Sequence, residues 1–207
     1  FIFITIVLQS APATAYIGGE FPGQDFEGAV SWDWGPFTCS GTRVSEHFIL
    51  TAAHCFLNNN DFDIYKNSFE LHLTGPLGSG DKNSISSKVV RVILHPEWQN
   101  KNYSAGSDLA LIEVSDTGGK SLVQIGTRPI VETEKTIVGG FGCKGPGIPR
   151  YSHMTIAIKY PIQVQNGGLI FGILDADGVG LSMACSGDSG AGVYRASLFT
   201  KKFEVIA

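Results

Sequence analysis

The sequence predicts an all-β protein built from two small barrels in tandem. Short segments rich in β-branched and aromatic residues recur along the 207-residue chain. Clusters of Gly, Pro, Asn, Asp and Ser separate them at intervals typical of barrels and sandwiches. No long stretch repeats its apolar residues with the period of a helix, so helices should be few and short. A linker at residues 115–129 divides the chain into two β-rich halves.

Eight segments carry the strand composition, which suits a pleated and half-buried surface. The segments of the first half are 43–52 (RVSEHFILTA), 68–75 (SFELHLTG), 88–96 (KVVRVILHP) and 108–114 (DLALIEV). Those of the second half are 135–142 (KTIVGGFG), 154–164 (MTIAIKYPIQV), 168–174 (GLIFGIL) and 190–199 (GAGVYRASLF). We expect a strand in each segment and turns between them.

Composition and charge exclude some classes of protein. A hydrophobic fraction of 43% and 26 glycines are typical of a globular chain that can bury a core. The net charge of −4 provides no basic excess to neutralise phosphates, so nucleic acid is not an expected partner. No apolar run reaches the roughly 18–20 residues that a membrane-spanning helix needs, so no such helix is expected.

The N-terminal segment is expected to be part of a signal peptide. Phe1 to Leu8 form a short apolar run, and Ala13 to Ala15 supply the small residues of a cleavage site. A buried β-strand is the alternative, because Phe, Ile, Thr and Val also favour strands. Cleavage after Ala15 would expose Tyr16 and would place the protein outside the cell or in the periplasm. With no initiating Met or basic residues, the sequence is expected to start within the signal.

Four cysteines, an even number, fit an exported protein with two disulfides. They are Cys39, Cys55, Cys143 and Cys185, and from spacing alone all three connectivities remain open. None of the spacings is C-x-x-C, so no zinc site is expected.

Three short stretches contain residues suited to nucleophilic catalysis. His54 ends LTAAHC, Asp108 begins DLALIEV, and Ser189 lies within ACSGDSGAG. Each has a structural alternative: a structural histidine, a strand-initiating cap and a polar turn. Together they provide the three groups that activate a serine, because a hydroxyl needs a base, and that base works best when a carboxylate orients it.

The stretches LTAAHC, DLAL and GDSG resemble the three signatures of the chymotrypsin/trypsin family of serine peptidases, in the family's His, Asp, Ser order. VILHPEW (residues 92–98) and YIGGE (residues 16–20) resemble the stretch before the family's aspartate and its mature N-terminus. An α/β-hydrolase is excluded, because its Gly-x-Ser-x-Gly motif is broken by Ala191 and its triad runs Ser, Asp, His.

The resemblance implies two tandem six-stranded antiparallel Greek-key barrels, at about 16–114 and about 130–207. By the same resemblance, His54 is the general base, Asp108 orients it, and Ser189 attacks the substrate carbonyl.

The resemblance also implies an oxyanion hole formed by the N–H groups of Gly187 and Ser189, for which a glycine suits the backbone. It further implies a Cys39–Cys55 disulfide. The remaining Cys143 and Cys185 are expected to pair.

The chain departs from the family pattern at the residues that govern activation and specificity. The family's new N-terminal amine pairs with the aspartate before the nucleophile, which implies a Tyr16–Asp188 pair here. No Arg or Lys precedes Tyr16, so we expect signal peptidase to expose the amine. By the resemblance, Met183 stands at the base of the primary pocket, where its apolar side chain predicts cleavage after apolar or small residues and not after Lys or Arg.

The sequence ends soon after Ser189, before the strands that complete the family's second barrel. We therefore expect a fragment with an incomplete second barrel. Ala191 and Gly192 also replace the family's usual Gly-Pro. The expected protein is an exported monomeric serine endopeptidase that needs no metal or cofactor, acts on peptides and proteins, and has protein inhibitors as further partners. The alternative is a catalytically impaired homologue that serves as a binding protein.

Overall fold

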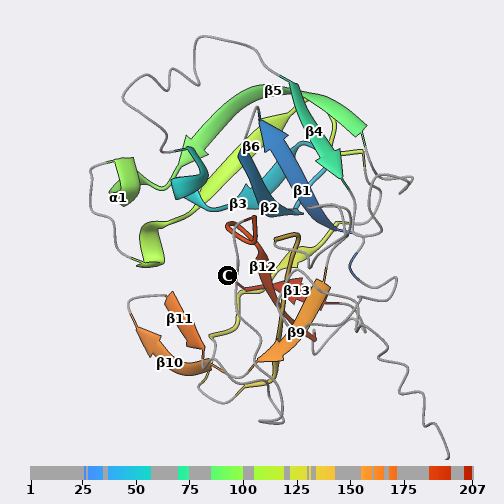
Figure 1. Ribbon diagram of the computed structural model, residues 1–207. Helices are drawn as coiled ribbons and strands as arrows, with labels where there is room; N and C mark the ends of the chain where they lie inside the picture. The colour runs from blue at the N-terminus through green and yellow to red at the C-terminus, as the bar shows by residue number, and fades with distance from the viewer. Residues whose placement is uncertain are drawn as a thin grey trace, which may run out of the picture.

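The computed structural model shows a protein built almost entirely from β-strands (Figure 1). It describes residues 26, 28–34, 37–56, 70–74, 85–99, 105–118, 122–129, 131, 134–142, 155–159, 161–165, 168–171, 187–196 and 203–206. Helical structure in this part is limited to α1 (Pro96–Gln99) and short 3₁₀ turns that include η2 (Ala53–Phe56) and η3 (Ala105–Ser107). None of the helices among these residues is long and apolar enough to cross a membrane.

Six antiparallel strands form a closed barrel in the order β1-β2-β3-β6-β5-β4. Their bounds are β1 Ala29–Trp34, β2 Phe37–Arg43, β3 Phe48–Thr51, β4 Glu70–Thr74, β5 Ile85–Leu94 and β6 Ala110–Val114. Pairing of β1 with β4 closes the ring, so every strand has two neighbours. Closure removes open strand edges.

Alternating side chains fill the barrel. In β6, every second residue is buried, which gives Ala110, Ile112 and Val114 to the core. Trp32 of β1 stacks on Phe56 of η2 with ring centroids 5.2 Å apart. The strand predicted at residues 108–114 is therefore present, and its alternating burial gives it one face in the core.

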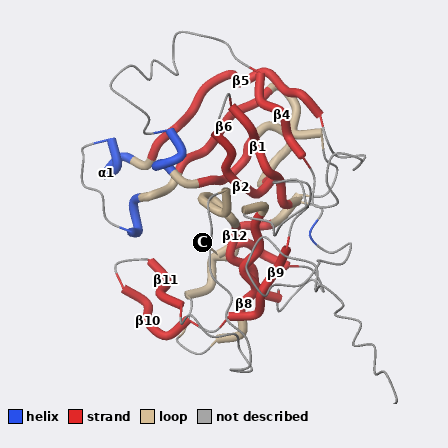
Figure 2. The backbone as a smooth tube through the Cα atoms, in the orientation of Figure 1, coloured by secondary structure: helices blue, strands red, loops and turns tan. Residues whose placement is uncertain are grey.

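The second half forms a five-stranded sheet in the order β7-β13-β12-β8-β9, with a separate hairpin of β10 and β11 (Figure 2). The bounds are β7 Gln124–Ile125, β8 Thr136–Gly140, β9 Thr155–Lys159, β10 Pro161–Gln165, β11 Gly168–Phe171, β12 Gly192–Ala196 and β13 Phe203–Val205. All its pairs are antiparallel except β7 with β13. The predicted all-β fold, with one closed barrel and a partial second one, is confirmed.

Strand β12 joins the second sheet to the barrel. The hydroxyl groups of Tyr194 in β12 and Thr42 in β2 lie 2.7 Å apart and share a hydrogen bond. Phe26 contacts the Tyr194 ring edge-on, at 5.4 Å between centroids, in a core cluster that also contains Phe141 and Val205. The turn that precedes β12 is thereby held against the barrel.

The strand predictions differ from the structure in five places. Residues 154–164 were expected to form one strand but contain β9 and the start of β10, which belong to different sheets. The expected linker contains the two-residue strand β7. Strands β1 and β13 lie in stretches where no strand was predicted, and β2 was expected only at its last residue.

Candidate active site

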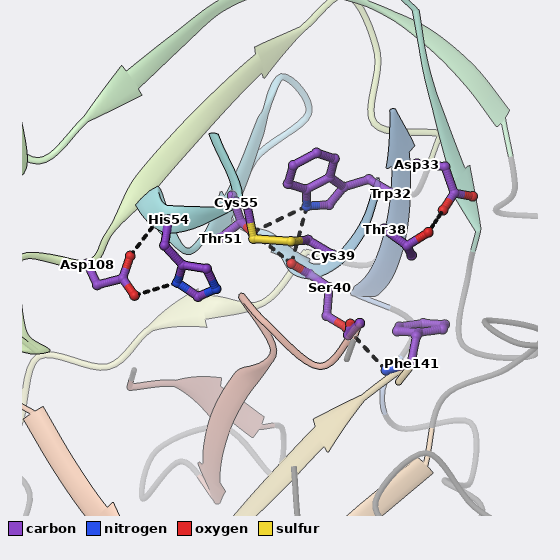
Figure 3. The surroundings of a disulfide bond; sticks show 11 residues. Trp32, Asp33, Thr38, Cys39, Ser40, Thr51, His54, Cys55, Asp108 and Phe141 are labelled. Carbon is purple, nitrogen blue, oxygen red and sulfur yellow. Dashed lines mark hydrogen bonds and ion pairs between the residues drawn. A yellow bond between two sulfur atoms is a disulfide. The ribbon is translucent and has the colours of Figure 1, made fainter. Parts of the chain in front are cut away.

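The end of β3 and the turn η2 place His54 at the edge of the barrel (Figure 3). Ala53 is fully buried and Phe56 nearly so, which anchors the turn, whereas the His54 side chain is 43% exposed. The next residue, Cys55, forms a disulfide with Cys39 of β2, with Cα atoms 6.5 Å apart. The predicted Cys39–Cys55 bridge is therefore confirmed, and it ties the histidine turn to β2.

Asp108 holds His54 at two points. Its Oδ2 lies 2.6 Å from His54 Nδ1, and its Oδ1 accepts a hydrogen bond of 2.8 Å from the His54 backbone N–H (Figure 3). The carboxylate comes from the residues between η3 and β6, and β6 pairs directly with β3. This strand pairing brings together two residues that are 54 positions apart.

The contact changes the pKa of both groups. The hydrogen bond to Asp108 and the charge of its carboxylate raise the pKa of His54, although burial opposes them. Burial alone would raise the pKa of Asp108, but hydrogen bonds from the His54 ring and from the backbone N–H groups of His54 and Ala53, together with the imidazolium charge, lower it. Asp108 is therefore ionised near neutral pH.

An ionised carboxylate can only accept hydrogen bonds, so the proton of neutral His54 lies on Nδ1. The lone pair is then on Nε2, away from Asp108. This is the tautomer that a general base requires.

Ser189 lies in the turn before β12, and glycines shape this turn. Gly187 has a φ of 98° and Gly190 a φ of 79°. Residues other than glycine rarely adopt this region of backbone conformation. A Cβ at Gly190 would lie 2.1 Å from Thr51 Oγ1 and 2.4 Å from the Ser40 carbonyl oxygen. Gly190 therefore allows the turn to approach β2 and β3 closely.

Asp188 is buried, with 5% of its surface exposed. Its Oδ1 accepts a 2.7 Å hydrogen bond from the Gly142 N–H. A Cβ at Gly140 or Gly142 would lie within 2.3 Å or 2.6 Å of this carboxylate, so these glycines, at the end of β8 and just after it, make room for the carboxylate. The predicted partner Tyr16 lies outside the described residues, and that pairing stays a prediction.

The Ser189 turn is attached to the barrel close to His54. The N–H of Ser40 donates a 2.7 Å hydrogen bond to the Ser189 carbonyl, and Ser40 follows the disulfide-bonded Cys39. In the described part of the chain, the hydrogen bonds of His54 run to Asp108 and none joins its ring to the Ser189 hydroxyl.

A cavity of about 180 Å³ lies between the two halves of the molecule. Its lining residues are Thr42, Leu50, Thr51, Ala52, His54, Asp108 and Leu109 from the barrel half, and Gly190, Ala191, Gly192 and Val205 from the other. The histidine, the aspartate and the residues directly after Ser189 therefore share one cavity.

Four predicted residues lie outside the described part of the chain: Tyr16, Cys143, Met183 and Cys185. Among the described residues, no three His, Cys, Asp or Glu side chains are grouped so that they could hold a metal ion. Sequence reasoning missed Ser40, which binds the Ser189 turn. Its only signal was a hydroxyl residue beside a disulfide cysteine.

A closed antiparallel barrel, a partial second sheet and a His–Asp pair beside a Gly-Asp-Ser-Gly turn define a chymotrypsin-like protein. The family model described as Trypsin matches residues 18–200. The chain therefore belongs to the trypsin family of serine peptidases.

Curated relatives are named chymotrypsin-like elastase family member 1. The protein from Bos taurus is 28% identical over 120 residues, which cover 56% of this chain and 42% of the relative. The proteins from Canis lupus familiaris and Homo sapiens are each 30% identical over 93 residues, which cover 44% of this chain and 34% of the relative. The chain thus spans less than half the length of these relatives.

Proposed function

We propose that the protein is a secreted serine endopeptidase that hydrolyses peptide bonds through an acyl-enzyme intermediate. The observation that carries this proposal is the two-point contact of Asp108 with the ring and backbone of His54. A protein that only binds peptides has no need of a base in this tautomer.

In the proposed reaction, His54 Nε2 takes the proton of the Ser189 hydroxyl as its oxygen attacks the substrate carbonyl. Asp108 stabilises the imidazolium that forms. His54 then gives the proton to the leaving amine, and a water molecule releases the acyl group from Ser189 by the same steps. Catalytic hydrogen bonds are often long without substrate, so we expect the Ser189–His54 contact to shorten when substrate binds.

The proposed oxyanion hole consists of the N–H groups of Gly187 and Ser189. Among the described residues, neither group donates a hydrogen bond within the protein, so both are available to a ligand. Donors held in place for the developing negative charge stabilise it at no cost of reorganisation during the reaction.

Specificity, activation and export belong to the same proposal. Met183 would accept apolar or small substrate residues, and the amine of Tyr16 would pair with Asp188 after signal cleavage. The Cys39–Cys55 disulfide supports export, because disulfides persist in oxidising compartments.

The proposal is tested by labelling the whole protein with a fluorophosphonate and locating the label by peptide mass spectrometry. The probe reacts only with an activated serine and requires little side-chain specificity. We expect label on Ser189 and none in the Ser189→Ala variant. A folded wild-type protein that stays unlabelled would contradict the proposal and would favour the binding homologue.

A further inference from the structure

Ser40 lies between the barrel and the Ser189 turn. It lies in β2, next to the disulfide-bonded Cys39, and is 1% exposed. Its backbone and side chain make hydrogen bonds to the residues on both sides of Asp188.

Two carbonyl groups of the turn accept hydrogen bonds from Ser40. The Ser40 N–H donates to the Ser189 carbonyl at 2.7 Å, and the Ser40 hydroxyl donates to the Gly187 carbonyl at 2.8 Å. The Phe141 N–H donates to the same hydroxyl at 3.1 Å (Figure 3). Because Phe141 supplies a proton to this oxygen, the hydroxyl proton is directed to Gly187.

Ser40 is itself held in one place. Its carbonyl accepts hydrogen bonds from the Thr51 hydroxyl at 2.7 Å and from the Trp32 indole N–H at 3.2 Å. Both side chains are buried in the barrel. The position of the turn is therefore fixed relative to the buried interior of the barrel.

The turn needs such an anchor because glycines lie on both sides of Asp188 and Ser189. Gly187 and Gly190 have positive φ angles, and glycine has the widest choice of backbone conformations of any residue. Without a fixed carbonyl, the Gly187 backbone could rotate and carry its N–H away from the oxyanion position.

We propose that Ser40 is a positioning residue for the oxyanion hole: its hydroxyl and N–H hold the carbonyls of Gly187 and Ser189 so that the N–H groups of these two residues converge on the substrate oxygen. This inference rests on the proposed peptidase function. Ser40 does not touch the substrate and acts through Gly187 and Ser189.

The test compares Ser40→Ala with Ser31→Ala in the whole protein. Ser31 lies opposite Ser40 in the β1–β2 pairing and is fully buried. Within the described part of the chain its hydroxyl has no hydrogen-bond partner. The two variants therefore remove the same group from neighbouring positions in the barrel, and only one of them loses contacts with the turn.

We measure the rate of fluorophosphonate labelling of Ser189 against pH, and kcat and KM on a peptide ester. For Ser40→Ala we expect the rate of labelling and kcat to fall about 10- to 100-fold. A displaced donor of the oxyanion hole should cost part of the rate that is lost when such a donor is removed. KM should change less than about 2-fold, since ground-state contacts remain. The pH midpoint should not move, because His54 and Asp108 are untouched. Ser31→Ala should match the wild type.

A folded Ser40→Ala protein with the wild-type labelling rate would overturn this inference alone. So would an equal loss in Ser31→Ala, or a shift of the pH midpoint, because either would show a general disturbance of the barrel. Failure of the wild type to label would overturn the proposed function and this inference with it. If Ser40→Ala does not fold, Ser40→Gly removes the same hydroxyl and is judged by the same outcomes.

Discussion

Asp108 raises the pKa of His54 through its hydrogen bond and its charge, against the opposing effect of burial. The proposed base must be neutral, so activity should be lost as the pH falls through this raised pKa. In Asp108→Asn the negative charge is absent, and the midpoint of the acid loss should move to lower pH. The maximal rate should fall by about 10⁴-fold, the loss known for this substitution in the family's triad.

The measurement is the pH dependence of Ser189 labelling in the wild type and in Asp108→Asn. Asp116→Asn is a suitable control, since this exposed aspartate lies after β6 and does not contact His54. A midpoint that stays unchanged or rises in Asp108→Asn would contradict the account of the pair.

We expect that no other residue can replace Gly190, because its φ is positive and there is no space for a side chain. An added Cβ would meet Thr51 Oγ1 at 2.1 Å, so Gly190→Ala must displace the Ser189 turn. Gly118 is the matched control: it has a φ of 72°, but its nearest neighbours are atoms of the Ile85 side chain. We expect both variants to lose about 1 kcal/mol or more of stability. Only Gly190→Ala should lose labelling of Ser189, and equal labelling of both would refute this view.

The turn η2 and strand β2 are joined covalently. The Cys39–Cys55 disulfide closes a loop with a sequence separation of 16, and such a loop restricts the unfolded chain by about 3 kcal/mol. We expect Cys39→Ala/Cys55→Ala to lower the free energy of unfolding by about this amount in urea titrations. A loss well below about 1 kcal/mol would show that the barrel alone fixes the His54 turn.

The sequence predicted the strands whose own residues carry a clear strand pattern. It did not predict strands that are recognised mainly by their pairing with other strands. Residues 108–114 alternate in burial and β6 was found there. Strand β13 has only three residues, and its pairing with β12 and β7 distinguishes it from a loop. Within the site, the motifs predicted His54, Asp108 and Ser189, and the structure brings the first two into contact. They could not reveal Ser40, because its partners Phe141 and Gly187 lie 101 and 147 residues away.

The barrel and the second sheet share the buried hydrogen bond between Thr42 and Tyr194. Burial raises the pKa of Tyr194 to about 12, although the hydrogen bond with Thr42 opposes this shift. A tyrosine whose pKa is higher in the folded protein stabilises the fold fully below about pH 10, the pKa of the unfolded chain. This contribution is lost as the pH rises toward 12.

Tyr194→Phe should therefore lower stability by about 1 kcal/mol at neutral pH, where the hydrogen bond is lost. As the pH rises from about 10 to 12, the stability of Tyr194→Phe should fall less than that of the wild type. Thermal unfolding of both proteins across this range tests the prediction. Parallel slopes would show that Tyr194 does not control alkaline unfolding.

The parallel pairing of β7 with β13 has a consequence for how the chain folds during synthesis. All six barrel strands lie within residues 29–114, so the ribosome delivers the whole barrel before β8 exists. Strand β7 leaves the ribosome soon afterwards, but its partner β13 begins only at Phe203. At about 5–20 residues per second, β7 waits roughly 4 to 16 seconds for its partner. During this interval all six barrel strands are present in the chain, whereas β7 still lacks the strand that pairs with it.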